Sequence, residues 1–547
     1  MKRLVRIGSR QLEIERTLVD RVVEYFDPVR GAARTRARFA TAMTNAYTGA
    51  SRDRRSMKEW KVSGGDADAD TLFDLETLRE RSRDLIRNQP LATGALATKV
   101  RYVVGSGLQL HPRINRKLLG LDDARAEEIE DQLQSEWESW ACSTECDYER
   151  TLTFADLTSL AWRSTLENGD VFALLPMLER APSHYALKVQ LVEADRVCNP
   201  EFKQNDKAMS GGIEKDPVTG APLRIHLLKD HPGALRARRG EWETVDIFGA
   251  ESGRRQVLHL YRKLRIGQSR GVPDLAPVIE LFKQLSRYTE AEIMAAVVNA
   301  MLTVFIETGS GTTGLGPMSP TGETGGKVGD DDVKLAAGAI IELKSGEKIS
   351  SVNPTRPNSQ FDPFVLAIIR QIAVSLELPY EVVIMHFTSS YSASRAALNE
   401  AWRFVRNSRE WVARSFCQPI YGAFVTEAVM RGRVGLPGFL RGDERIRRAY
   451  LGARWLGPGR GQIDEAKEVE AAVQRINNHL STLADETAEM SGGDWEANLA
   501  QRAREVARRA EFGLEPPSTP GVASAPAPAK APAKAGGDDT TDDEEAA

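Results

Sequence analysis

The chain has 547 residues and a mass of 60.3 kDa, which is too long for one compact core because domains usually run to about 50–250 residues. Its 73 basic and 77 acidic residues give a net charge of −4, and this excludes a strongly basic nucleic-acid binder as a description of the whole chain. Residues 1–61 nevertheless carry +8, from 15 basic and 7 acidic residues, and residues 516–547 carry −4, from 2 basic and 6 acidic residues. A basic head and an acidic tail indicate different partners at the two ends.

The first 60 residues are polar and rich in arginine, and they have no strong apolar stripe. Such a stretch is usually a solvated face, and the alternative is an arm that binds an acidic partner or nucleic-acid phosphate. Residues 72–105 have helical spacing, and Pro90 divides them into two helices. A strand is predicted at 108–111, and amphipathic helices are predicted at 126–140 and 154–166, the second with capping residues Thr153 and Asp156.

The middle of the chain changes from sheet to helix. Residues 168–261 are predicted to form a mixed sheet, because short strand-like runs are separated by Gly, Pro and Asp turns. Residues 273–306 have a long helical pattern, and a Gly/Thr/Ser/Pro loop and a short β segment follow. A second helix is expected from Ser359, with Asp362 in the capping-box position. The most apolar stretch, 294–305, is shorter than the roughly 20 residues of a membrane span, so no membrane-integral protein is expected.

The last part of the chain is predicted to be helical up to its tail. A loop at 377–395 leads into a third long helix, and Pro419 inside its apolar pattern predicts a kink. Two further helices are predicted at 464–483 and 495–512, before a Pro/Ala-rich, acidic tail that is expected to be disordered. These patterns predict an α+β, mainly helical protein.

The four cysteines do not indicate a metal site. Cys142 and Cys146 form C-x3-C, but no second pair or neighbouring histidine completes a tetrahedral zinc site. Free thiols in a reducing compartment are expected for these two and for Cys198 and Cys417. No metal and no cofactor is predicted.

One motif matches a catalytic pattern. GQSRG at 267–271 fits GxSxG, the nucleophile elbow of serine hydrolases, with Ser269 as the nucleophile. The elbow needs a helix directly after the serine, and Pro273 disfavours one there. GGKV at 325–328 is not a phosphate-binding loop, because Val328 replaces the required hydroxyl residue. The chain is therefore not expected to be an enzyme, and a serine hydrolase is kept as the alternative function.

Five stretches in order resemble the lambda-type portal family of tailed bacteriophages. They are RERSRDLIRNQPLATGALATKVRYVVGSGLQLHP (79–112), ENGDVFALLP with QLVEADRVCNP (167–176 and 190–200), GQSRGVPDLAPVIELFKQLSRYTEAEIMAA (267–296), LPYEVVIMHFTSSYSASRAALNEAWR (378–403) and WLGPGRGQIDEAKEVEAA (455–472). Any one of them would be weak, but five in this order are specific. GxSxG falls inside the third stretch, which favours a structural role for Ser269. Glu465 stands where the family pattern has proline.

This resemblance implies a phage portal protein. Such proteins form a ring, usually of twelve subunits, at one vertex of the capsid, and double-stranded DNA passes through its channel during packaging and ejection. The implied partners are other copies of the chain, double-stranded DNA, the terminase large subunit, the major capsid and scaffold proteins, and the head–tail connector proteins that later replace terminase. The implied location is the virion, with host cytoplasm during assembly. ATP hydrolysis in these systems belongs to terminase.

The resemblance also implies an order of regions. They are a basic N-terminal arm (1–46), an α/β wing (47–272), a first stem helix (273–306), a clip (307–357), a second stem helix (358–378), a tunnel loop (379–393), a long kinked helix (394–435), a helical crown (436–512) and a disordered acidic tail (513–547).

The tunnel loop is the candidate DNA-handling site. From Met385 to Ser392 it has no fixed charge, and an almost neutral loop suits DNA that must slide, because each Lys or Arg contact to phosphate adds a salt-sensitive increment of affinity. The alternative is an ordinary loop between helices. The residues expected to line the narrowest part of the bore are Met385, His386, Phe387, Thr388, Ser389, Ser390, Tyr391, Ser392 and Arg395.

Overall fold

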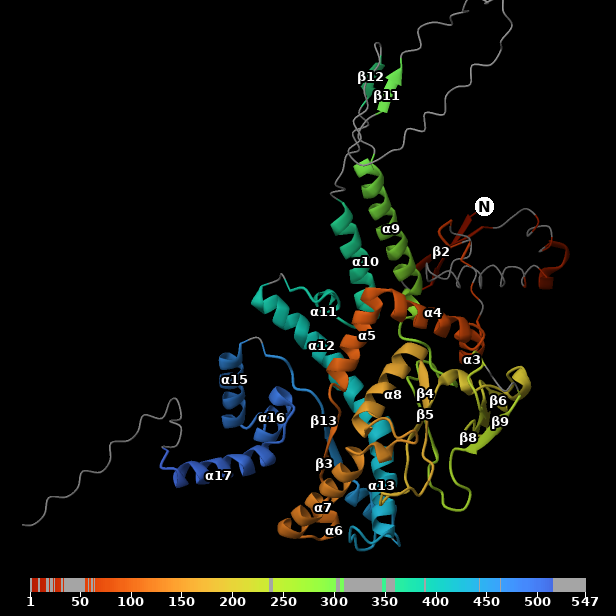
Figure 1. The fold of residues 1–547 in the computed structure, drawn as a ribbon. Helices are drawn as coiled ribbons and strands as arrows, with labels where there is room; N and C mark the ends of the chain where they lie inside the picture. The colour runs from red at the N-terminus through yellow and green to blue at the C-terminus, as the bar shows by residue number, and fades with distance from the viewer. Residues whose placement is uncertain are drawn as a thin grey trace, which may run out of the picture. The chain divides into compact units, whose positions relative to one another are not determined.

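A computed structural model of the protein describes residues 2–7, 10–15, a few short pieces between 19 and 62, and residues 64–235, 240–301, 305–308, 347–350, 360–387, 390–441, 443–462 and 464–514. The chain divides into two compact units, and Figure 1 labels the helices and strands of the described residues. The first consists of Met1–Thr77 and Lys263–Arg270, and the second of Leu78–Arg262 and Gly271–Ala547. Among the described elements helices dominate over strands, so the predicted α+β, mainly helical class is confirmed.

The first unit contains a hairpin that the sequence did not predict. Strands β1 (Lys2–Ile7) and β2 (Arg10–Glu15) pair antiparallel, with Lys2 opposite Glu15. The short helix α3 (Ala67–Thr71) begins at Asp66, whose side chain accepts a hydrogen bond from the Ala69 amide at 2.8 Å.

The second unit begins with helices whose ends the sequence specifies. Helices α4 (Leu75–Asn88) and α5 (Pro90–Val103) are separated at Pro90, as predicted. Thr153 and Asp156 form the predicted capping box, each side chain bonding the other's backbone amide. The remaining helices of this part are α6 (Arg116–Leu119), α7 (Asp123–Ala141) and α8 (Phe154–Asn168).

The predicted mixed sheet is present as separate antiparallel sheets. One has the strand order β10-β4-β5, with β4 (Asp170–Leu174) in the centre and buried at every position. The other has the order β6-β7-β8-β9, and its first two strands are too short to show an alternating pattern in the sequence. The other strands are β5 (Gln190–Val192), β6 (Met209–Ser210), β7 (Ile213–Lys215), β8 (Pro222–Leu228), β9 (Trp242–Asp246) and β10 (Val257–Tyr261).

Two sequence predictions about the next helices are wrong in detail. Helix α9 (Ile279–Met301) starts after a 3-10 turn (Ala276–Val278) and ends before Phe305, which belongs to strand β11 (Phe305–Thr308). Helix α10 (Phe361–Ser375) is preceded by Gln360 at its N-cap with no side-chain capping bond, so Asp362 does not close a capping box. Ser359 lies outside the described residues, as do the Gly-rich loop and GGKV. Strand β12 (Glu347–Ser350) pairs with β11.

The predicted kinked helix is confirmed, and the kink has a physical cause. Helix α12 (Tyr391–Val412) continues through a π-helical turn (Ala413–Cys417) into α13 (Gln418–Met430). Pro419 has no amide hydrogen to donate to the preceding turn, and π turns commonly accommodate such a defect.

The end of the described chain departs from the predicted pair of helices. The stretch 464–483 is not one helix, because α15 (Glu465–Asn477) ends before His479, which has a φ of 56°. A new helix, α16 (Leu483–Ser491), then precedes α17 (Trp495–Glu511). Helix α14 (Glu444–Tyr450) and strand β13 (Ala453–Leu456) were not predicted, and β13 pairs with β3 (Gln109–Pro112).

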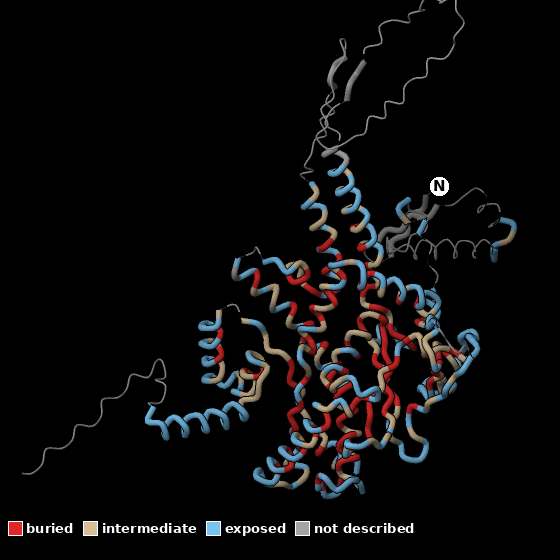
Figure 2. The backbone as a smooth tube through the Cα atoms, viewed as in Figure 1, coloured by how far each residue is buried: buried red, intermediate tan, exposed pale blue. Residues whose placement is uncertain are grey.

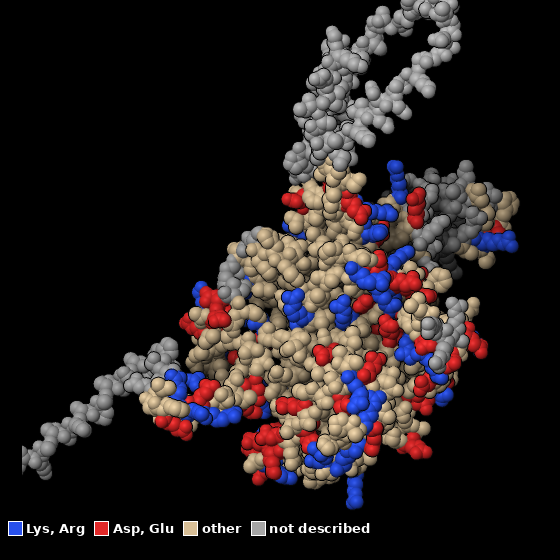
Figure 3. Space-filling view, viewed as in Figure 1, with Lys and Arg blue, Asp and Glu red and all other residues tan. Residues whose placement is uncertain are grey.

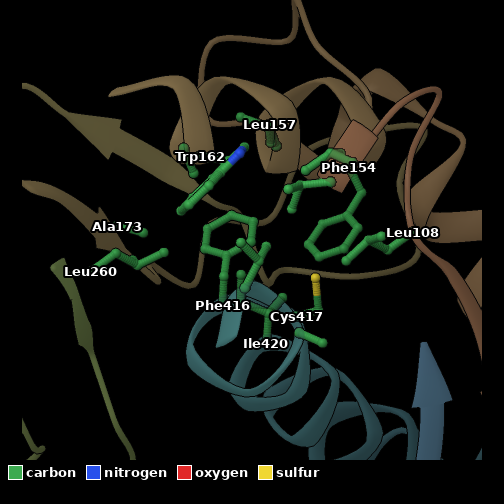
Figure 4. Packing of buried hydrophobic residues seen from close by; sticks show 14 of the residues in the cluster. Leu108, Phe154, Leu157, Trp162, Ala173, Leu260, Phe416, Cys417 and Ile420 are labelled. Atoms are coloured by element: carbon green, nitrogen blue, oxygen red, sulfur yellow. The ribbon is translucent and has the colours of Figure 1, made fainter. Parts of the chain in front are cut away.

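The core of the second unit surrounds the π turn and α13 (Figures 2 and 4). Phe416, Cys417 and Ile420 point towards Phe154 and Trp162 of α8. Trp137 is the centre of an aromatic cluster whose ring centroids lie 4.9–5.6 Å away, formed by Trp140, Phe154, Tyr421, Phe424 and Trp455. Segments more than 250 residues apart in sequence therefore share one core.

Candidate functional site

The predicted tunnel loop (379–393) is not a loop throughout. Residues 380–384 form helix α11 (Tyr380–Ile384), and α12 begins at Tyr391, so the loop is confined to the segment between these two helices. Thr388 and Ser389 lie outside the described residues. Met385 and Phe387 expose 57% and 46% of their surface. Of the other predicted residues, Tyr391 is the first of α12, and exposed or half-exposed side chains are carried by His386, Ser390, Ser392 and Arg395.

Both ends of this loop are held by the fold. Val382 and Val383 of α11 are buried, and α11 packs against α5 and α10. Met385 takes the left-handed conformation that ends α11, and the His386 amide donates to the Glu381 carbonyl at 3.1 Å. At the other end the Ser390 hydroxyl accepts from the Ala393 amide and caps α12. The described part of the loop is thus an exposed, uncharged segment between two fixed ends.

A partly buried arginine fixes the helix behind the loop. The Arg409 guanidinium of α12 donates to the carbonyls of Tyr102 at 2.9 Å, Val103 at 3.1 Å and Pro458 at 2.9 Å. Burial, with a smaller contribution from Arg406, lowers the pKa of Arg409 to about 10, so the guanidinium stays charged at neutral pH. The positive charge beside the last carbonyls of α5 also interacts favourably with the negative end of that helix's dipole. This role of Arg409 was not predicted from the sequence.

A cleft of about 780 Å³ lies between α12, β13 and α16. Its wall contains the pairs Arg406–Glu489 and Arg454–Asp485, the second at 2.9 Å. Charges of both signs line it, so it does not have the character of an anion site. The face seen in Figure 3 is likewise a mixture of Lys/Arg and Asp/Glu.

Helices α9 and α10 lie side by side (Figure 1). The Tyr288 ring of α9 lies 5.6 Å from the Phe361 ring and 5.0 Å from the Phe364 ring of α10, measured between centroids. The chain leaves through α9, forms the antiparallel pair β11–β12, and returns through α10. This arrangement is a helical pair with an antiparallel pair of strands between its two helices, and residues 309–346 between those strands lie outside the described residues.

The arginine-rich helix α4 contributes to a buried ionic network. Arg79 donates to the Asp170 carboxylate at 2.7 Å and to the Asn168 carbonyl at 2.9 Å, and only 6% of its side chain is exposed. Asp170, at the start of β4, is fully buried and also contacts His259 of β10 at 3.0 Å. Arg79 therefore ties α4 to the three-stranded sheet.

A second carboxylate completes this network. Asp195 pairs with Arg83 and lies 3.4 Å from Arg79. Burial acts to raise the pKa of Asp195, but the two arginines outweigh burial and hold that pKa below its usual value. Neither acidic partner, Asp170 or Asp195, was predicted from the sequence. The only local signal for them is that the acidic Asp170 begins an otherwise apolar strand.

Ser269 lies in the first unit, in a buried setting unlike a nucleophile elbow. Its hydroxyl donates to the Asp68 carboxylate, and its amide donates to the same side chain at 2.7 Å. Only 4% of Ser269 is exposed, and the next helical residue is Ala276. Arg265 pairs with Asp70 at 2.6 Å alongside. These contacts fix the segment 263–270 on α3, which is a structural role.

The remaining features considered in the sequence are the cysteines, a metal site and a membrane span. All four cysteines are free thiols, and Cys146 and Cys417 are buried. Within the described ranges, no group of three or more His, Cys, Asp or Glu side chains is arranged to hold a metal ion. Among the helices of those same ranges, none is long and apolar enough to cross a membrane.

Comparison with known proteins decides the family. Residues 53–409 match the family model described as phage portal protein, lambda family. The chain belongs to the lambda family of phage portal proteins. It is similar to portal protein B of Escherichia phage lambda, with 26% identity over 481 residues that cover 84% of this chain and 89% of the relative. Its similarity to the portal protein of Escherichia phage N15 is 26% over 484 residues, which cover 84% and 90%.

Solved structures that resemble this portal-family chain include two from gene transfer agent particles. A chain of the native virion matches with a TM-score of 0.40 and 12% identity, over 81% of this chain and 94% of that one. A chain of the empty particle's neck matches with a TM-score of 0.44 and 12% identity, over 80% and 94%. The resemblance found in the sequence is confirmed by the family match, and the buried setting of Ser269 gives no support to the serine hydrolase alternative.

Proposed function

We propose that this chain forms a ring of twelve subunits at one capsid vertex and that double-stranded DNA passes through the ring during packaging and ejection. The observation that carries the proposal is the match of residues 53–409 to the lambda portal family. The fold supports it, because a helical pair with two antiparallel strands and an exposed neutral loop are attached to one large core. No catalytic role is part of the proposal.

The regions of the ring are proposed from the order of elements. The antiparallel sheets and their helices form the wing (47–272), after the arm (1–46). Helices α9 and α10 are the stem (273–306 and 358–378), and β11 and β12 belong to the clip between them (307–357). The tunnel loop (379–393) is followed by the kinked helix (394–435), the crown (436–512) and the tail (513–547).

The proposed partners follow the same order. The clip is where the terminase large subunit docks and where head–tail connector proteins replace it. Residues 1–61, which include the arm (1–46) and carry +8, are proposed to contact capsid or scaffold proteins, since their charge is complementary to an acidic surface. The assembled location is the virion, reached from the host cytoplasm.

The ring itself is the first expected result. The purified chain should assemble into a particle of about twelve times the 60.3 kDa chain mass, because closed rings arise when each subunit binds the next through the same heterologous contact. Native mass spectrometry, with electron microscopy for the central channel, measures this directly. A particle that stays a monomer or dimer at micromolar concentration would contradict the proposed function.

A positive charge added to the tunnel loop should slow the passage of DNA during packaging. Phe387→Lys adds a cation at an exposed loop position in every subunit. Each new phosphate contact steepens the salt dependence of DNA binding by about one unit of log–log slope, so the packaging rate at low salt should fall several-fold and recover as salt is raised.

The matched control for this variant is Phe387→Gln, which also removes the aromatic ring but adds no charge. Packaging into purified heads is measured for both at low and high salt, after intact rings have been verified. Equal rates for the two variants at low salt would remove Phe387 from the DNA path.

A further inference from the structure

Helix α17 has an apolar stripe that nothing covers in the described chain. Every residue from Glu496 to Leu514 is exposed (Figure 2). Leu499 and Val506 expose 58% and 46% of their surface. With Ala503 and Ala510 they repeat at steps of four, three and four residues, which places all four on one side of the helix.

A helix of this kind needs a partner to be stable. Helix α17 has 17 residues, only slightly above the length of about 12–15 residues below which isolated helices are marginal in water, and most helical stability in proteins comes from packing of an apolar face. The start of α17 is held, because Asp494 lies 3.3 Å from His111 and Glu496 lies 3.4 Å from Arg113. The turns beyond that point are exposed and are therefore available to pack against another surface.

A complementary stripe lies on α15 of the same chain. Val469 and Val473 are 48% and 49% exposed, and Ile476 follows at the next step of three residues. The buried residues of this helix, Glu468 and Ala472, are on a different side. Helix α15 thus packs into its own subunit with one side and leaves a second apolar side open.

One edge of the α17 stripe carries arginines, whereas the α15 stripe is flanked by glutamates. Arg502 and Arg509 flank the stripe on α17, and neither forms an ion pair within the part of the chain that the structure describes. Glu465 and Glu470 flank the stripe on α15 and are exposed. The stretch 464–491 as a whole has seven acidic and two basic residues, a net charge of −5. The apolar residues of both helices recur at steps of three and four, and the arginine side of α17 is opposite in charge to α15. The two stripes are therefore complementary.

We propose that α17 of one subunit packs its Leu499–Val506 stripe against the Val469–Val473 stripe of α15 in a second copy of this chain. The proposal rests on the proposed ring. Each copy carries both surfaces, and within one chain they do not cover each other, because both are exposed. A contact between two different surfaces on identical subunits is the kind that closes into a ring. In the crown, the arginines of α17 in one subunit then face the glutamates of α15 in its neighbour.

Cross-linking of the full-length chain tests the contact. In a Cys142→Ser background, which removes the exposed native thiol, Val473→Cys and Val506→Cys are combined in one chain and treated with a short bismaleimide. Interchain contact predicts a ladder of covalent oligomers from the double variant and none from either single variant. A cross-linked monomer without a ladder would mean that α17 folds onto its own α15, and it would overturn the proposal.

Charge reversal gives a second readout with a matched control. Arg502→Glu with Arg509→Glu should raise the concentration at which rings dissociate roughly tenfold, and Glu465→Arg with Glu470→Arg in the same chain should restore it. The control is Arg504→Glu with Arg508→Glu, which makes the same charge change on the opposite side of α17 and should leave rings intact. If both pairs of substitutions weaken the rings equally, the proposed contact between α17 and α15 is wrong.

Native mass of the unaltered chain separates the two proposals. If rings form but the double cysteine variant gives no cross-linked ladder, the proposed ring is supported and the proposed contact between α17 and α15 is wrong. An unaltered chain that forms no ring overturns both.

Discussion

Replacing Gly271 by alanine is expected to destabilise the second unit by at least about 3 kcal/mol, a cost in the range of severe overpacking. A Cβ atom at this position would lie 1.9 Å from the Gly169 carbonyl oxygen and 2.9 Å from the Tyr261 Cβ atom. The first of these neighbours is backbone, so no side chain can rotate away. Gly169 itself has a φ of 88°, which only glycine adopts at low cost. The two chain segments therefore approach as closely as they do only because both residues are glycine.

The control for Gly271→Ala is Gly94→Ala. Gly94 is inside α5, and nothing lies within 4 Å of a Cβ atom built there. Alanine is favoured over glycine in a helix by about 1 kcal/mol, so this variant should be as stable as the parent chain or more so. Urea unfolding followed by tryptophan fluorescence compares the two. An unfolding midpoint for Gly271→Ala equal to that of the parent would show that the backbone at Gly169 can move.

Features set by neighbouring residues were predictable. Pro90 separates α4 from α5 because proline cannot continue a helix, and Thr153 caps α8 because its partner Asp156 is three residues away. The kink at Pro419 follows from its missing amide hydrogen. In each case the determining group lies within a helical turn of its effect.

Features that depend on distant partners were not predictable. Asp68 holds Ser269 from 201 residues away, so the GxSxG pattern alone could not reveal that its serine is a structural residue. The end of α9 was placed too late because Phe305 continues the apolar pattern although it begins a strand. The spacing of apolar residues indicates which residues are buried, but it does not show whether an apolar residue at the end of the pattern belongs to the helix or to the strand that follows.

The candidate site was predicted from composition and from the family resemblance together. The structure places Met385, Phe387 and Ser390 in an exposed segment between α11 and α12. That position agrees with a loop available to line a channel, and the role in DNA handling stays a prediction. Arg409, which fixes the helix behind it, was missed because the three carbonyls that it binds come from two other segments.

Arg79→Met should destabilise the second unit by about 3–5 kcal/mol, the usual cost of removing one member of a buried ion pair. Methionine keeps most of the aliphatic volume, so the cost comes from charge. It leaves the fully buried Asp170 carboxylate with His259 and without its arginine. The matched control is Arg81→Met, the same change on an exposed residue of the same helix, which should cost less than about 0.5 kcal/mol.

The pH dependence of that loss identifies its cause. The pKa of Asp195 is lowered in the folded chain by Arg79 and Arg83 against the effect of burial. A lowered carboxyl pKa contributes stability that is complete above the unfolded value of about 4 and is lost as the pH falls through the folded value. The gap in unfolding midpoint between Arg79→Met and the parent should therefore be widest near neutral pH and narrow below about pH 4. A gap that is the same at both pH values would assign the loss to packing, and a gap no larger than that of Arg81→Met would mean that the network does not hold α4 on the sheet.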